Sequence, residues 1–220
     1  NIGGTEVSQL CAEVADSSAC SSQAAKRKYA GLEKFVYEGT ITIPFKCNSW
    51  YVAHYFNARS ASMNVENPNG SYQDTNRVPP IAPLNGRPFY IEVKINNDYT
   101  FASGNSSPIF TADPIPYFCK DLVSTYNYSV IDADGDSLSY SLVPGSYIQN
   151  KSGNSVFTDT NIINFRQAFL NYRQPEYTSS QPLHDAVINP VTGNITFKQR
   201  VKGRYVVVLK VTEYDKNNPD

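Results

Sequence analysis

Three aspartates alternate with small residues in one short stretch of the chain, Asp132-Ala133-Asp134-Gly135-Asp136. Carboxylates at positions i, i+2 and i+4 of a loop that contains a glycine can surround one hard cation. Ca²⁺ is bound by several oxygen ligands, and a bound ion relieves the repulsion among neighbouring carboxylates. We therefore predict a calcium site with Asp132, Asp134 and Asp136 as its principal ligands. The alternative is a solvated acidic turn.

The acidic loop does not follow the EF-hand pattern. Position 12 counted from Asp132 is Val143, whereas an EF-hand has a bidentate glutamate there. A strand-like stretch also follows the loop, because Leu138, Tyr140 and Leu142 alternate with serines. An EF-hand is therefore excluded, and we expect a loop between strands.

Sequence patterns of known catalytic sites are absent. The chain has two histidines, His54 in an apolar stretch and His184 in a polar one, and no HExxH, Gly-x-Ser-x-Gly, Walker A or GxGxxG pattern. The acids Glu38, Glu92 and Glu213 fall in strand-like stretches, where a structural role explains them. We expect that the protein is not an enzyme.

The composition argues against two classes of partner. The net charge of the 220-residue chain is -1, so it lacks the basic surface that a nucleic-acid-binding protein uses. No apolar run approaches the roughly 18 residues of a membrane-spanning helix. Hydrophobic residues make up 40% and charged residues 18% of the chain, which is typical of a packed fold. We expect no nucleic-acid partner and no membrane insertion.

Patterns typical of β-strands recur along the whole chain. In residues 89–95, apolar side chains alternate with Tyr90, Glu92 and Lys94, which is the period of a half-buried strand. The other predicted strands cover residues 35–37, 40–43, 49–56, 137–142, 195–197 and 205–213, and the only helix candidates are residues 21–30 and 161–170. Residues 189–194 predict a turn in which Gly193 supplies a positive φ.

A run of small and turn-forming residues, 102–108, interrupts these strands. Pro108 suits the entry to an edge strand because it lacks an amide hydrogen. The pattern therefore predicts an all-β fold of two β-sandwich domains in tandem, residues 1–104 and 105–220.

The chain has four cysteines, none in a CxxC pair: Cys11, Cys20, Cys47 and Cys119. An even number favours disulfides and an oxidising compartment, and four buried thiols are the alternative. Four cysteines allow three pairings. We expect the pairing of Cys11 with Cys20 and of Cys47 with Cys119.

Trp50 and Tyr51 are candidates for ligand binding, since exposed aromatic side chains can bind sugars. Trp50 is the single tryptophan, and other aromatic residues follow it at Tyr55 and Phe56. The alternative, which we favour, is a core tryptophan near Cys47, because sandwich cores often pack a tryptophan against a disulfide.

Residues 107–215 resemble a cadherin-like domain in three ordered motifs. These are Pro108-Ile109-Phe110, the stretch DADGDSLSYSL at 132–142, and a strand that opens at Gly203-Arg204-Tyr205 and runs to Glu213. The resemblance implies an immunoglobulin-like β-sandwich.

The same resemblance implies where the calcium site lies. In cadherin-like tandems the Asp-x-Asp loop faces the preceding domain, and the linker contributes further oxygens, which here are those of Asn105 and Ser106. Since these are weaker ligands than acids, we expect a site at the domain junction with the low affinity of extracellular modules, about 10⁻⁴–10⁻³ M.

A wider set of motifs is similar to a module of very large secreted proteins of the Bacteroidetes, often described as gliding-motility-associated or as adhesins and often exported by type IX secretion. The motifs are TEVSQLC (5–11), YEGTITIPFKCNSW (37–50), FYIEVKINN (89–97), NSSPIF (105–110), PYFC (116–119) and NPVTGNITF (189–197). Two departures remove cysteines that the family has, at Asn57-Ala58-Arg59-Ser60 and at Gly104.

This resemblance implies an extracellular, cell-surface module with a structural or adhesive function. Its partners would be neighbouring domains or copies of the same surface protein. The alternative is a carbohydrate-binding accessory module of a secreted enzyme, with surface glycans as the partner.

Overall fold

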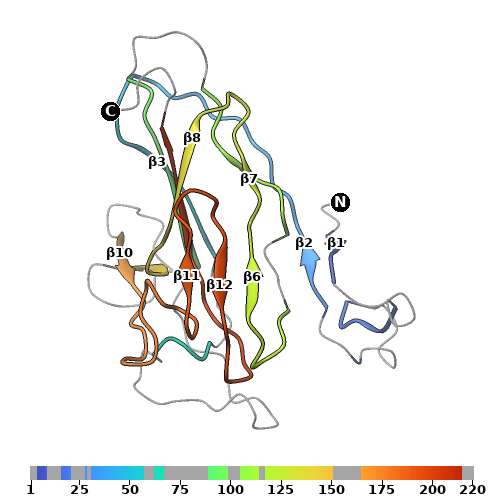
Figure 1. Ribbon diagram of the computed structural model, residues 1–220. Helices are drawn as coiled ribbons and strands as arrows, with labels where there is room; N and C mark the ends of the chain where they lie inside the picture. Colours follow the sequence, from blue (N-terminus) through green and yellow to red (C-terminus); the bar gives the residue numbers. More distant parts are fainter. Residues whose placement is uncertain are drawn as a thin grey trace. The chain divides into compact units, whose positions relative to one another are not determined.

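Figure 1 shows the computed structural model, which describes residues 4–8, 16–20, 28, 31–56, 62–66, 89–98, 105–113, 117–150 and 165–214. The chain divides into two compact units, Asn1–Lys46 with Ile115–Tyr117, and Cys47–Pro114 with Phe118–Asp220. Regular structure in the described residues consists of β-strands, with no α-helix and only a 3₁₀ turn at residues 16–17. The prediction of an all-β protein is therefore confirmed.

The smaller unit contains one pair of short strands. β1 (Thr5–Glu6) pairs antiparallel with β2 (Glu33–Lys34), and the amide of Val7 extends the pair by donating to the carbonyl oxygen of Leu32 at 2.9 Å. The strands predicted at residues 35–37 and 40–43 do not form a ladder with any described residue. Their apolar side chains are exposed, Tyr37 by 73% and Ile41 by 69%. The sequence pattern typical of strands is thus present here without a partner strand in the part of the chain that the structure describes.

The larger unit contains the remaining strands, all paired antiparallel. They are β3 (Trp50–Phe56), β4 (Phe89–Ile95), β5 (Ile109–Phe110), β6 (Ser124–Tyr126), β7 (Val130–Ile131), β8 (Ser137–Leu142), β9 (Ser146–Asn150), β10 (Phe165–Phe169), β11 (Val187–Ile188), β12 (Ile195–Phe197) and β13 (Leu209–Tyr214). The sheets have the orders β10-β9-β4-β3, β11-β12-β6, β13-β8 and β5-β7. Figure 1 shows β11, β12 and β6 side by side.

The four-stranded sheet joins strands from both sides of residue 104. β4 pairs with β9 through Tyr90 and Ser146, and its other edge pairs with β3 along all seven residues. The compact units of the chain therefore do not coincide with residues 1–104 and 105–220, and the number of domains stays a prediction.

The helix candidate at residues 161–170 is wrong where the structure describes it. Residues Phe165–Phe169 form β10, which pairs with β9 residue by residue. A strand partner on β9 satisfies the backbone of this stretch, so tertiary pairing overrides the local helical signal. Residues 21–27, 29 and 30 of the other candidate lie outside the described residues.

Two clusters of buried side chains form the core of the larger unit. The first contains Val65, Tyr147, Leu170, Tyr172 and Tyr177, and the second contains Leu183, Ala186, Ile195 and Phe197. Tyr205 packs against both clusters, whereas Val206 packs against the first and Val207 against the second. The extended stretch before β13 therefore connects the two clusters, because successive side chains of an extended chain point to opposite sides.

The predicted turn between β11 and β12 is confirmed. The side chain of Asn189 accepts hydrogen bonds from the amides of Val191 and Thr192, at 2.9 and 3.0 Å. Gly193 has a φ of 72°, and a Cβ there would lie 2.9 Å from the ring of Tyr140. Glycine is thus required both by the backbone conformation and by the close approach of Tyr140.

The side chain of Asn64 links three stretches of backbone. It is fully buried, its Nδ2 donates to the carbonyl oxygens of Pro182 and Val206 at 2.8 and 2.7 Å, and its Oδ1 accepts from the amide of Val206 at 3.0 Å. A buried polar group without a partner is strongly unfavourable. Asn64 therefore holds the extended stretch at Val206 in place against the core.

We expect Asn64→Ala to lower the free energy of unfolding by about 2–4 kcal/mol, because it leaves three backbone groups without their partner. The exposed Asn48→Ala, which removes only a hydrogen bond to its neighbour Ser49, should change it by less than about 0.5 kcal/mol. Urea unfolding followed by tryptophan fluorescence measures both. Equal stabilities of the two variants would contradict this role of Asn64.

Candidate metal centre

The acidic loop joins β7 to β8 and is wound around the side chain of Asp132. Its Oδ1 accepts hydrogen bonds from the amides of Asp134 and Asp136, both at 3.0 Å. Gly135 has a φ of 75°, which turns the chain between these two residues. The loop is therefore closed on itself by its own first carboxylate.

A further carboxylate, that of Glu213, reaches the loop from β13. The register of β8 and β13 pairs Glu213 with Leu138, two residues after the loop ends. One carboxylate oxygen each of Asp132, Asp136 and Glu213 lie within 4.8 Å of one another. Oxygens that bind Ca²⁺ at about 2.3–2.6 Å can be at most about 5 Å apart. These three carboxylates could thus bind the same ion.

Residues just before β5 also contact the cluster. The side-chain amide of Asn105 donates to Oε1 of Glu213, and the backbone amide of Ser106 donates to Oδ2 of Asp134 at 2.5 Å. β5 pairs with β7, with Ile109 opposite Ile131, which places the preceding residues beside the loop that follows β7. Three segments distant in sequence therefore meet at this cluster.

One oxygen of the cluster has no hydrogen bond, and the carboxyl group of Glu213 has a raised pKa. Oδ2 of Asp132 is buried and has no hydrogen-bond partner in the described structure. Burial raises the pKa of Glu213, and so do the charges of Asp132 and Asp136 and a hydrogen bond with Asp136, whereas the hydrogen bond from Asn105 lowers it. Close carboxylates and one buried oxygen without a hydrogen bond thus meet at this site.

The structure brings the five predicted ligands into one region but gives them different roles. Asp132 and Asp136 share the three-carboxylate cluster, whereas Asp134 holds the amide of Ser106. Asn105 bonds to Glu213, and Ser106 takes part through its backbone. All five belong to the larger compact unit, and a location at a domain junction stays a prediction.

Sequence analysis did not identify Glu213 as a ligand. The only signal was its position as the acid that ends the last strand of the cadherin-like motif. Its proximity to Asp132 follows from the β8–β13 register, which the sequence does not specify.

Trp50 and Tyr51 cannot form one binding platform. They are successive residues of β3, so their side chains point to opposite faces of the sheet. Trp50 is half-buried, and Tyr51 is 56% exposed. The structure therefore gives no support to a joint sugar site at these two residues.

The cysteines that the structure describes are free thiols: Cys20 and Cys47, which are half-buried, and Cys119, which is exposed. The predicted bridge between Cys47 and Cys119 is therefore not formed in this structure. Cys47 is instead tied to the end of β4, where its amide donates to Oδ1 of Asn97 at 2.7 Å and its carbonyl oxygen accepts from the amide of Asn97 at 3.0 Å. Cys11 lies outside the described residues, so the structure describes only Cys20 of the predicted Cys11–Cys20 bridge, and the Cys20 thiol is free.

Comparisons of the chain with protein-family models, with curated proteins and with solved structures find no match. In the described part of the chain, no helix has the length and apolar character needed to cross a membrane.

We expect Glu213→Gln to raise the free energy of unfolding in the presence of a chelator, by about 1 kcal/mol, because it removes one of several close negative charges. The amide oxygen of the new side chain can still accept from Asn105. A carboxyl group with a raised pKa in the folded state loses its stabilising contribution as pH rises through that pKa. The advantage of the variant should therefore appear as pH rises above 4.5, the ordinary value for glutamate.

Thermal unfolding between pH 4 and pH 8 in a chelator measures this difference. Glu176→Gln, at an exposed glutamate outside the cluster, is the matched control and should have little effect. A lower stability of Glu213→Gln at neutral pH would show that the carboxylates do not repel one another.

Proposed function

We propose that this chain is a calcium-stiffened structural or adhesive module of a larger extracellular, cell-surface protein. The observation that carries the proposal is the buried, unpartnered Oδ2 of Asp132 in a cluster with Asp136 and Glu213. A divalent cation would give this oxygen its missing partner and neutralise the surrounding charge. Carboxylate oxygens in an irregular loop are the ligands that Ca²⁺ prefers.

Calcium binding at this cluster would stiffen the module. Asp132 and Asp136 lie in the loop before β8, Glu213 lies on β13, and Asn105 precedes β5. Asn105 donates its side-chain amide hydrogen to Glu213, and rotation of this amide group would turn its oxygen toward a cation instead. One ion would thus replace several repulsive contacts by a link between distant parts of the chain.

An open apolar surface supports a place in a larger assembly. In the pairing of β3 with β4, Val52 lies opposite Val93, and His54 lies opposite Ile91, so these side chains share one face of the sheet. Val52, Ile91 and Val93 are 42–49% exposed. A contiguous exposed apolar surface is typical of a protein interface. We propose that neighbouring domains or copies of the same protein are the partners.

Carbohydrate binding by Trp50 and Tyr51 is the less favoured function, because these side chains lie on opposite faces of β3. A structural role for the acidic cluster needs no small-molecule ligand other than the ion. Glycan binding that Trp50→Ala or Tyr51→Ala abolishes would support this function, whereas a calcium-dependent stability supports the structural one.

We expect calcium to raise the melting temperature of the protein. With a Kd of about 10⁻⁴–10⁻³ M, a hundredfold excess of calcium adds about 2.7 kcal/mol, or about 5–10 °C for a chain of this size. Asp132→Asn should abolish this shift, whereas Glu176→Gln should keep it. Scanning calorimetry with CaCl₂ and with EGTA provides the measurement, and an unchanged melting temperature of the wild type would refute the calcium site.

A further inference from the structure

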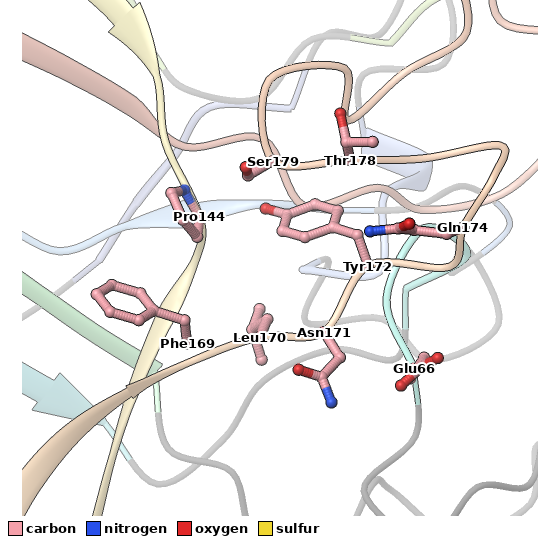
Figure 2. Close-up of a pocket in the computed structure, with 9 residues that line it drawn as sticks. All are labelled: Glu66, Pro144, Phe169, Leu170, Asn171, Tyr172, Gln174, Thr178 and Ser179. Atoms are coloured by element: carbon pink, nitrogen blue, oxygen red, sulfur yellow. The ribbon is translucent and has the colours of Figure 1, made fainter.

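The larger unit contains a pocket of about 510 Å³ that none of the residues of the acidic cluster lines. Its lining residues, drawn in Figure 2, are Glu66, Pro144, Phe169, Leu170, Asn171, Tyr172, Gln174, Thr178 and Ser179. They come from the segment between β8 and β9, from the end of β10, from the turn that follows it, and from the short stretch around Val65. Small-molecule sites commonly have volumes of about 300–1,000 Å³.

The floor of the pocket is fixed by the core. Leu170 and Tyr172 are 7% and 8% exposed and belong to the first core cluster. The amide of Leu170 donates to the carbonyl oxygen of Gly145 at 2.8 Å, and the hydroxyl of Tyr172 accepts from the amide of Gly145 at 3.2 Å. On the other side, the amide of Glu66 donates to the carbonyl oxygen of Asn171 at 2.8 Å. These hydrogen bonds hold together the segments that line the pocket.

The turn above the floor is also held in place. The amide of Tyr177 donates to the carbonyl oxygen of Arg173 at 2.9 Å, and Oγ1 of Thr178 accepts from the amide of Gln181 at 3.0 Å. Figure 2 shows Thr178 and Ser179 on one side of the Tyr172 ring, with the amide group of Gln174 beside it. Polar groups thus approach the pocket from a turn whose conformation is fixed.

Several polar side chains of the lining are available to a ligand. The side chains of Glu66, Asn171, Gln174 and Ser179 make no hydrogen bond to any residue that the structure describes. Together they offer a carboxylate, two amides and a hydroxyl, which include both donors and acceptors. An exposed aromatic ring, that of Phe169 with 55% exposure, lies at the edge of the same pocket beside Pro144 (Figure 2).

This combination of groups fits a neutral, polyhydroxylated ligand. Its lining includes no lysine and no arginine, and its one charged residue is Glu66, so a phosphate or sulfate group would not be neutralised. An entirely apolar ligand would make no use of the amides and the carboxylate, whose residues are exposed. A sugar presents hydroxyl groups to amides and a carboxylate, and its C–H face to an aromatic ring.

We propose that the pocket binds a neutral saccharide, with one sugar ring against Phe169 and its hydroxyl groups bonded by Asn171, Gln174 and Glu66. The site is separate from the acidic cluster, and it supplies the adhesive contact that a calcium-stiffened surface module would present. Saccharide binding can be tested without calcium, so the test of the saccharide site does not depend on the calcium site.

A glycan array of neutral and anionic oligosaccharides, probed with the labelled full chain in EGTA, identifies the ligand. Titration calorimetry with the best neutral glycan then compares variants. We expect Phe169→Ala and Asn171→Ala each to weaken binding at least about tenfold. Tyr51→Ala is the matched control, because Tyr51 is an aromatic residue with nearly the same exposure, 56%, but does not line the pocket. It should leave the affinity unchanged.

Three results would overturn the saccharide site: no neutral glycan above background, a preference for anionic glycans only, or an affinity that Phe169→Ala and Asn171→Ala do not reduce more than Tyr51→Ala does. Melting curves establish that each variant is folded. If Phe169→Ala does not fold, Gln174→Ala takes its place, because Gln174 is exposed and its side chain bonds to no described residue.

Discussion

Close negative charges are the central constraint on the larger unit. The pairing of β8 with β13 brings Glu213 to the loop at Asp132–Asp136, and the pairing of β5 with β7 brings Asn105 there. These strand pairings therefore place the carboxylates of Asp132, Asp136 and Glu213 close together. Among the described residues, the amides of Asn105, Ser106, Asp134 and Asp136 donate hydrogen bonds to these carboxylates. A cation at this point would replace repulsion among these carboxylates by a link between three segments.

The larger unit combines a hydrogen-bonded, packed core with an exposed apolar face on one sheet. Asn64 and the stretch Tyr205–Val207 connect two buried clusters, and Gly193 allows the turn at Asn189–Asn194 to pack on Tyr140. By contrast, β3 and β4 leave an apolar face exposed. A rigid body with an uncovered apolar face is what a module of a larger assembly would require, and the pocket beside Phe169 adds a polar cavity to that body.

Local patterns in the sequence were sufficient for features that depend on neighbouring residues. The strand at Phe89–Ile95, the turn at Gly193 and the position of the acidic loop between strands all follow from short-range patterns. Features that depend on pairing between distant strands were not predictable. The sequence does not specify the register that brings Glu213 to Asp132. It also does not show that residues 165–169 have a strand partner, or that residues 40–43 have none among the described residues. The pocket likewise depends on the contact between Glu66 and Asn171, more than 100 residues apart in the sequence.

Amide hydrogen exchange of the acidic loop tests the central claim most directly. The amides of Ser106, Asp134 and Asp136 all donate to aspartate oxygens of the acidic loop, so an ion that fixes these carboxylates must slow their exchange. In saturating calcium we expect exchange at these three amides to slow by up to about 100-fold relative to EGTA. The amides of Val191 and Thr192, in the unrelated turn at Asn189, should slow less. Equal exchange at Ser106, Asp134 and Asp136 with and without calcium would contradict the account.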